Sequence, residues 1–224
     1  MIKLCGISDL HGTLPKIEEC DVLIICGDIV PLEYQRYNKL SEDWFRDEFA
    51  TWVKNAPCKK VIFIGGNHDF WFERIGKKKI DEIIKELGLE DKLVYLKDSS
   101  YVYEGYSFYG CPWCTGPIGW AFIDEFGNKY NEIQDCDILL THQPPRVNKL
   151  GCSYPGTAWE EDWSSEGLKN IIKQRNIRYN FCGHIHSGSH TEEGLVGYDT
   201  KFYNVSIKDE DYQFTYSPLY IEIN

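Results

Sequence analysis

Short apolar segments recur along the chain, and each has the length of a strand rather than of a helix. Segments this apolar are typical of strands that are buried on both faces of a sheet. The second and third segments are continuous apolar runs, VLIIC and VIFI, and the fifth, YNFC, is the weakest. We therefore predict five buried strands, at residues 2–7, 22–26, 61–64, 138–141 and 179–182.

Three of the segments between these strands have apolar residues at helical spacing. The first spans residues 41–54, and Ser41 is suited to cap its amino end. The second spans residues 77–87 and is followed by Gly88, which favours a helix end. The third spans residues 165–175. An alternation of short buried strands with amphipathic helices predicts a layered α/β architecture.

Two regions have the pattern of antiparallel pairs. In residues 101–110, aromatic side chains alternate on both sides of Glu104-Gly105, which has the composition of a tight turn. Near the carboxyl end, residues 201–207 and 218–223 have the pattern of two terminal strands, and we expect a second antiparallel pair there. The sequence contains no internal repeat, low-complexity tract or linker, so we expect a single domain over residues 1–224.

A residue type that binds metal ions follows each of the five predicted strands. In open α/β sheets the carboxyl ends of the strands meet at one crevice, where ligands bind. Carboxylate, amide and imidazole groups from these five places would therefore meet at one site. The motifs, in chain order, are Asp9-Leu10-His11, Gly27-Asp28, Gly66-Asn67-His68-Asp69, His142 and Gly183-His184-Ile185-His186.

The spacing within these motifs suits a metal site. Side chains two residues apart point to the same side of an extended segment, so Asp9 can act with His11, and His184 with His186. Asp28 stands alone after its strand, and a single carboxylate can bridge two metal ions. Aspartate and histidine are suitable ligands for divalent transition metals such as Zn, Fe and Mn.

Each motif taken alone has an ordinary structural explanation. A single histidine after a strand is most often a hydrogen-bonded polar residue, and an isolated Gly-Asp is most often a turn. Five motifs in this order, which contain five of the six histidines, favour a metal site instead. Only His190 lies outside them.

Composition restricts the partners of this site. The chain has 224 residues, a net charge of −11 and a hydrophobic fraction of 42%, which indicate a globular protein that does not bind nucleic acid or anionic membranes non-specifically. The first residues lack the apolar run of a signal peptide or membrane span. The nine cysteines are an odd number, so we expect a reduced, cytoplasmic protein.

The segment Cys111-Pro112-Trp113-Cys114 is a C-x-x-C motif, which could be a redox pair or half of a zinc site. A second C-x-x-C that would complete a structural zinc site is absent, and the context is not that of a thioredoxin. We therefore interpret the motif as two reduced thiols in a loop.

The order of the strand-end motifs resembles that of the calcineurin-like metallophosphoesterases over residues 9–186. Within that family, Pro112-Trp113, Trp120-Ala121-Phe122 and Thr141-His142-Gln143-Pro144-Pro145 are most similar to the metallophosphoesterase-domain proteins, which are regarded as phosphodiesterases. The resemblance implies an α/β fold, a four-layer αββα sandwich with two mixed β-sheets and the metal ions at one end of both sheets.

The resemblance also implies the ligands of two divalent metal ions, with Mn favoured and Fe, Zn, Ni or Mg as alternatives. One ion would be held by Asp9, His11, Asp28 and His186. The other would be held by Asp28, Asn67, His142 and His184, so that Asp28 bridges the two. A hydroxide that bridges the ions would attack phosphorus, while His68 protonates the leaving oxygen and Asp69 fixes the orientation of His68.

These features predict a phosphoesterase whose substrate is a small phosphate ester. Among such enzymes, they favour a phosphodiesterase that acts on cyclic nucleotides and similar diesters. The second Asp and the Arg that protein phosphatases of this superfamily carry after Gly-Asp are absent from residues 27–32. Trp113 is the best candidate to line a substrate pocket. Arg146 could contact phosphate, although most such arginines are surface residues. A phosphomonoesterase or nucleotidase is the alternative activity, and a metal-poor protein-interaction scaffold is the alternative class, which the intact ligand set disfavours.

Overall fold

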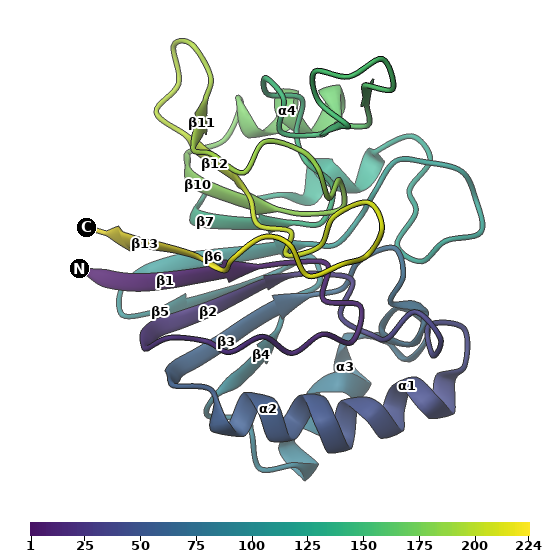
Figure 1. Ribbon diagram of the computed structural model, residues 1–224. Coiled ribbons are helices and arrows are strands. Elements are labelled where there is room, and N and C mark those ends of the chain that lie inside the picture. Colours follow the sequence, from purple (N-terminus) through teal and green to yellow (C-terminus); the bar gives the residue numbers. More distant parts are fainter.

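Two mixed β-sheets pack face to face in the computed structural model, which describes residues 1–224 (Figure 1). The first sheet has the strand order β13-β1-β2-β3-β4, and the second has the order β11-β12-β10-β7-β6-β5. The strands of the first sheet are β1 (Ile2–Ile7), β2 (Cys20–Cys26), β3 (Cys58–Ile64), β4 (Leu93–Tyr95) and β13 (Leu219–Ile223). Those of the second sheet are β5 (Ser99–Tyr103), β6 (Tyr106–Cys111), β7 (Cys136–Thr141), β10 (Ile177–Cys182), β11 (Glu193–Gly194) and β12 (Lys201–Asn204).

Alternate residues of the central strands face different layers, because successive side chains of a strand point to opposite faces. In β2, Val22 and Ile24 lie in the core between the two sheets, whereas Leu23 and Ile25 lie in the core between the first sheet and its helices. Both faces of the strand are therefore buried, which explains why its sequence is a continuous apolar run.

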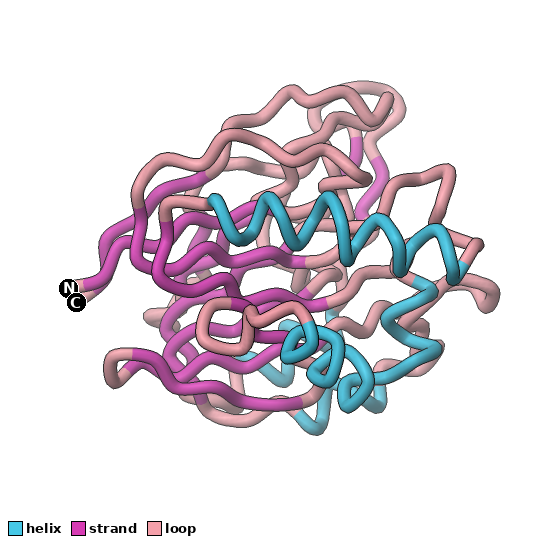
Figure 2. Tube along the Cα trace, turned by 90° about the horizontal axis from the view of Figure 1, so that it is seen from below, coloured by secondary structure: helices cyan, strands magenta, loops and turns pink.

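Helices cover the outer face of each sheet and complete four layers (Figures 1 and 2). On the first sheet, α1 (Asn38–Trp44), a π-helical turn at Phe45–Phe49 and α2 (Ala50–Asn55) form one continuous helical segment beside α3 (Phe70–Glu86). On the second sheet lie α4 (Glu166–Ile172) and a short 3₁₀-helix at Asn128–Glu132. A separate two-stranded ribbon joins β8 (Cys152–Ser153) to β9 (Glu161–Asp162). The expected αββα sandwich is confirmed.

All five strands predicted from the sequence occur, and each ends at the predicted residue. The helix predicted at residues 77–87 is the second part of α3, because the left-handed φ of 74° at Gly76 interrupts this helix and separates its first turns. Ser41 was expected to cap a helix but lies inside α1, where its hydroxyl donates to the carbonyl of Tyr34. Ser165 does cap α4, since its side chain accepts a hydrogen bond from the N–H of Leu168.

The predicted hairpin at residues 101–110 is confirmed. Strands β5 and β6 are antiparallel, and the turn residues Glu104 and Gly105 both have positive φ, at 49° and 82°, as a type I′ turn requires.

The prediction of a second antiparallel pair at the carboxyl end is wrong. Strand β12 pairs in parallel with β10 in the second sheet, whereas β13 pairs antiparallel with β1 in the first. The chain between them crosses from one sheet to the other through a bridge between Ser206 and Ser8. Each strand is therefore stabilised by a different sheet rather than by the other strand.

The core between the sheets makes a prediction about stability. Phe181 in β10 is 0% exposed, stacks on Tyr203 with 5.2 Å between ring centroids, and packs across the sheets against Gly6 of β1. We expect Phe181→Ala to lower the free energy of unfolding by about 3–5 kcal/mol, because it leaves a cavity at the contact between the sheets. Denaturant titration followed by fluorescence and circular dichroism measures this change.

The matched control is Phe126→Ala, which removes a phenylalanine that is 80% exposed. This variant should differ from the wild type by no more than about 0.5 kcal/mol. Equal losses in the two variants would contradict the view that the contact between the sheets stabilises the fold.

Candidate metal centre

The five predicted motifs meet at the carboxyl ends of strands from both sheets. Strands β1, β2 and β3 lead to Asp9, Asp28 and Asn67, and strands β7 and β10 lead to His142 and His184. Several of these residues have the left-handed backbone that non-glycine residues rarely adopt, with φ of 57° at Asp9, 52° at Asp28 and 69° at His184. Such strain is found mainly where a functional site needs it.

Asp28 lies at the middle of the cluster. Its Oδ2 atom is 3.3 Å from Nε2 of His142, 3.7 Å from Nε2 of His11 and 3.9 Å from Nε2 of His68. Its Oδ1 atom accepts a hydrogen bond from the backbone N–H of His68 at 2.8 Å. The carboxylate is buried, so one anionic group is surrounded by three imidazoles away from bulk water.

Asp9 supplies a second buried carboxylate beside that of Asp28. Its Oδ1 atom is 3.5 Å from Nε2 of His186, and both of its oxygens accept from the backbone N–H of His184, at 3.1 and 3.0 Å. The Nδ1 atom of His186 donates to the carbonyl of Asp209 at 2.7 Å, which leaves Nε2 directed at the cluster. A hydrogen bond of this kind at the far nitrogen is how metal-binding histidines are usually oriented.

His142 is oriented in the same way. Its Nδ1 atom donates to the carbonyl of Cys26 at 2.7 Å, and its Nε2 atom lies 2.9 Å from Oδ1 of Asn67. The sixth histidine, His190, supports the loop that carries His186, because its Nε2 atom donates to the His186 carbonyl at 2.8 Å and its ring stacks on Tyr216.

The protonation of the cluster follows from these contacts. Although burial opposes the charged form, the positive charges of His142 and His68 hold the pKa of Asp28 well below its usual value. Burial also opposes a charged ring at His142, yet Asp28 and Asp9 raise its pKa to about 9. Burial lowers the pKa of His11 to about 3. The two carboxylates therefore attract cations, and protons compete with metal ions for the same donor atoms.

The donor set fits a divalent cation. Both ring nitrogens of His11 are buried without a hydrogen-bond partner, which is costly unless another group occupies that position. In each of four groups of three side chains, the donor atoms lie within 4.8 Å of one another. The groups are Asp9-His11-His186, His11-Asp28-His68, Asp9-Asp28-His142 and Cys114-His142-His184. Six of the seven predicted ligands thus belong to these groups, and Asn67 reaches them through His142.

His68 faces the cluster from the first sheet. Its Nδ1 atom donates to Oε1 of Gln35 at 2.6 Å, and its ring packs 4.6 Å from that of Trp120. Burial lowers its pKa, with Asp28 acting in the opposite direction. Gln35 therefore holds the ring so that Nε2 points toward Asp28 and the site.

Asp69 does not have the role expected for it. Its carboxylate accepts hydrogen bonds from the backbone N–H groups of Ile29, Val30 and Gly66, at 3.0, 3.0 and 2.9 Å, and makes none with His68. Burial and the nearby Asp28 raise the pKa of Asp69 to about 7. Asp69 thus joins the loops that follow β2 and β3. The hydrogen bond that orients the ring of His68, which the sequence suggested for Asp69, is made by Gln35.

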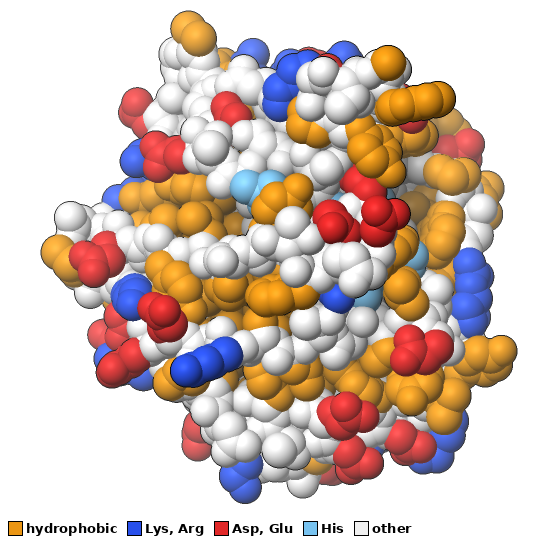
Figure 3. Space-filling model, viewed as in Figure 1, with side chains coloured by type: hydrophobic (Ala, Val, Ile, Leu, Met, Phe, Trp, Pro, Cys, Tyr) orange, Lys and Arg blue, Asp and Glu red, His pale blue; other side chains and the backbone are white.

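A cavity of about 470 Å³ opens beside the cluster. Asn67 and His184 border it on one side, and the aromatic side chains of Trp120, Tyr154 and Trp163 form much of the rest. The charged residues among its lining are both acidic, Glu161 and Glu210. Figure 3 shows histidine atoms reaching the surface among hydrophobic and acidic side chains at this end of the molecule.

The structure places neither predicted substrate residue on this cavity. The indole N–H of Trp113 donates to the carboxylate of Asp98, and its ring packs against Phe122. Arg146 pairs with Asp162 at 2.9 Å. Trp120 and Trp163 are the tryptophans that line the cavity, and Trp120 also packs against His68.

Tyr212 was not found by sequence reasoning. Its ring lies 4.9 Å from that of His11 and 5.2 Å from that of His186, and it comes from the loop between β12 and β13. Neither Tyr212 nor Gln35 belongs to a recognisable motif, since each reaches the site through the path of a loop.

Comparison with known proteins agrees with this geometry. The family model described as calcineurin-like phosphoesterase matches residues 2–188. The chain belongs to this family.

Several proteins are similar to the chain. The UPF0046 protein T07D4.2 of Caenorhabditis elegans is 27% identical over an alignment of 257 residues, which covers 99% of this chain but only 60% of that protein. The uncharacterized protein MJ1162 of Methanocaldococcus jannaschii is 26% identical over 83% of this chain and 80% of its own length. The phosphopantetheinyl hydrolase PptH of Mycobacterium tuberculosis has the same fold, with a TM-score of 0.57 and 16% identity over 93% of this chain and 90% of that chain.

In this structure, no helix combines the length and the apolar character that crossing a bilayer requires.

The geometry of the cluster makes a prediction about metal content. We expect the purified chain, reconstituted with Mn²⁺, to bind two equivalents, and Asp28→Ala to weaken both sites together, because Asp28 is the group that the surrounding imidazoles share. His68→Ala should keep a metal content close to that of the wild type. Elemental analysis after gel filtration measures the stoichiometry.

Asp43→Ala, which removes a half-buried aspartate of α1 that pairs with Lys39, serves as the control and should leave both sites intact. A saturating stoichiometry of one or zero in the wild type would contradict a dinuclear centre.

Proposed function

We propose that the chain is a dinuclear metal-dependent phosphodiesterase that hydrolyses small phosphodiesters, such as cyclic nucleotides. Membership of the calcineurin-like phosphoesterase family supports a phosphoric ester hydrolase. The seven residues proposed to bind the two ions are Asp9, His11, Asp28, Asn67, His142, His184 and His186, and their contacts converge on Asp28 and Asp9.

The charge of the cavity is the observation that favours a diester. A phosphomonoester carries between one and two negative charges at neutral pH, whereas a diester carries one. The cavity beside the cluster is lined by Glu161 and Glu210 and by no lysine or arginine. A second negative charge on the substrate would therefore find no compensating cation among the lining side chains, so the substrate with the lower charge is favoured.

The aromatic walls of the cavity suit the second substituent of a diester. Trp120, Tyr154 and Trp163 present ring surfaces next to Asn67 and His184. Flat rings such as nucleobases stack on aromatic side chains, a contribution of about 1–3 kcal/mol per base. A diester with one planar substituent can therefore place phosphorus near the cluster and its ring in the cavity.

Different side chains of the site would have different roles in the reaction. Bound divalent ions supply Lewis acidity and a nucleophile at neutral pH. Asp9 and Asp28 hold the charge of the site, while the backbone and side-chain hydrogen bonds of His142 and His186 keep their Nε2 atoms directed inward. His68, whose Nδ1–H is held by Gln35, would give a proton from Nε2 to the departing oxygen when its ring is in the imidazolium form, which carries a proton on both nitrogens.

The cavity makes a prediction about substrate class. We expect kcat/KM for bis(p-nitrophenyl) phosphate to exceed that for p-nitrophenyl phosphate, and cyclic nucleotides to be hydrolysed faster than mononucleotides, because the diesters carry less charge. Initial rates with each pair at the same metal concentration test this.

Asp28→Ala, purified in parallel, should lose activity on every substrate, which excludes a contaminating phosphatase. A clear preference of the wild type for both monoesters would assign the chain to the phosphomonoesterases or nucleotidases instead.

The position of His68 makes a prediction about leaving groups. A nitrophenolate departs without a proton, whereas an alkoxide needs one. His68→Ala should therefore slow hydrolysis of an alkyl or ribose ester by about 10²–10⁴-fold, and leave hydrolysis of a nitrophenyl ester nearly unchanged. Steady-state kcat values on both kinds of ester measure the difference.

The two esters are assayed with the same preparation of His68→Ala, so the rate on the nitrophenyl ester is the control for the rate on the alkyl or ribose ester. Equal losses on both esters would mean that His68 binds the substrate or a metal rather than donating a proton.

A further inference from the structure

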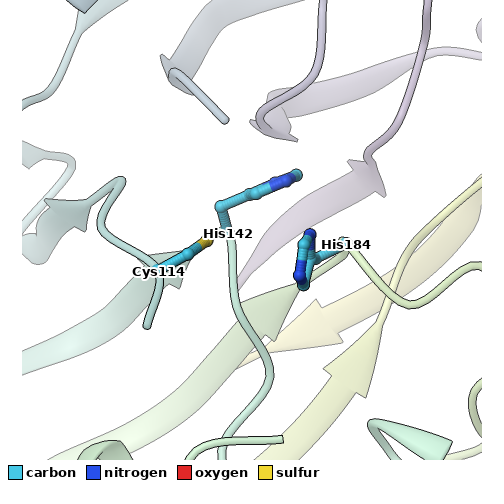
Figure 4. Close-up of side chains that lie close together, drawn as sticks. All are labelled: Cys114, His142 and His184. Carbon is cyan, nitrogen blue, oxygen red and sulfur yellow. The ribbon is translucent and has the colours of Figure 1, made fainter. Parts of the chain in front are cut away.

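Cys114 lies beside the second of the two proposed metal positions. It extends its sulfur toward His142 and His184 (Figure 4). The sulfur and one ring nitrogen of each histidine all lie within 4.8 Å of one another. Strand β6 ends three residues earlier, so this cysteine comes from a different strand end than either histidine.

The backbone holds Cys114 firmly in this place. Its N–H donates to the carbonyl of Phe122 at 2.8 Å, and its own carbonyl accepts from the N–H of Asp124 at 2.9 Å. The residue is 1% exposed, and the hydrogen bond that its thiol makes, to the carbonyl of Pro112, is long at 4.0 Å. By contrast, the buried thiol of Cys182 donates to the carbonyl of Tyr203 at 3.4 Å. The thiol of Cys114 therefore has no close partner within the protein.

Each of the two histidines has one ring nitrogen within 4.8 Å of this sulfur. His142 uses Nδ1 for the carbonyl of Cys26, which leaves Nε2, 2.9 Å from Oδ1 of Asn67, as the nitrogen that can bind an ion. The hydrogen bonds of His184 are made by its backbone N–H to Asp9, while its ring packs edge-on 5.1 Å from that of His142. Two imidazoles and one thiol thus lie close together, and Cys114 and His184 both border the cavity beside the cluster.

We propose that Cys114 is a sulfur ligand of the ion held by His142 and His184, and that it makes this position selective for thiophilic ions such as Zn²⁺ over Mn²⁺. The proposal rests on the metal centre of the proposed function and adds a donor to it. Cysteine and histidine together suit zinc, whereas Mn²⁺ prefers oxygen donors. Binding would replace the S–H bond by a metal–sulfur bond, and the proton would leave to solvent.

Cobalt spectroscopy tests this directly. Co²⁺ substitutes for Zn²⁺, and a sulfur ligand produces a charge-transfer absorption in the near ultraviolet that oxygen and nitrogen ligands do not. The full chain is stripped of metal and titrated with Co²⁺. We expect the wild type to develop this band in proportion to bound cobalt, and Cys114→Ser to bind cobalt without it.

Cys111→Ser is the matched control, because Cys111 is a buried thiol of the same segment that belongs to no group of potential ligands. This variant should keep the band. Competition with a chelating dye measures metal affinity. Cys114→Ser should bind Zn²⁺ at least about tenfold more weakly than the wild type, a typical loss when a group that supports a metal site is removed. Its affinity for Mn²⁺ should be unchanged.

The spectrum of the wild type decides the question even if a variant folds poorly. Cobalt bound without the band would mean that Cys114 is a buried small hydrophobic residue, and the proposal would be overturned while the metal centre stands. Failure of the wild type to bind any cobalt, zinc or manganese would overturn both.

Discussion

The burial of two carboxylates at the meeting point of two sheets is the constraint on which the site depends. Asp9 and Asp28 are almost fully removed from water, where each charge costs several kcal/mol unless other groups compensate it. The protein offers backbone N–H groups and the rings of His142 and His186. Although burial opposes the charged forms of these rings, the nearby carboxylates raise their pKa values to about 9. Burial keeps the rings of His11 and His184 neutral by lowering their pKa values to about 3, so these rings can bind cations without losing a proton, whereas cations must displace the protons of His142 and His186.

Close approach of the strand-end loops makes this arrangement possible. A Cβ atom at Gly66 would overlap Oδ1 of Asp28, and one at Gly183 would overlap the side chains of Ser8 and Asp9. The glycines next to the metal-binding motifs therefore allow one loop to lie directly against the carboxylate of another. Asp69 also holds the loops after β2 and β3 together, because its carboxylate accepts hydrogen bonds from N–H groups of both loops.

Much of the fold and of the cluster can be predicted from the sequence because both depend on local patterns. A strand buried on both faces needs an apolar run, and each run ends where the polar motif begins, so strand ends such as Ile64 and Thr141 are visible in the sequence. Residues whose position depends on the path of a loop carry no such pattern. Gln35 and Tyr212 reach the site in this way, and Trp113 leaves it. The predicted pairing of the carboxyl-terminal strands is wrong for the same reason, since the pattern of a strand does not specify which sheet the strand joins.

The ligands are divided between the two sheets, and this division links packing to chemistry. Asp9, His11, Asp28 and Asn67 follow strands of the first sheet, whereas His142, His184 and His186 follow strands of the second. The separation of the two groups is therefore determined by the side chains that fill the core between the sheets, which include Phe108, Ile138 and Phe181. An ion that bonds to both groups binds the packed state and not the separated sheets, so it stabilises that packing by mass action. The core in turn keeps the donor atoms at the spacing that the ions need, and neither the fold nor the site is independent of the other.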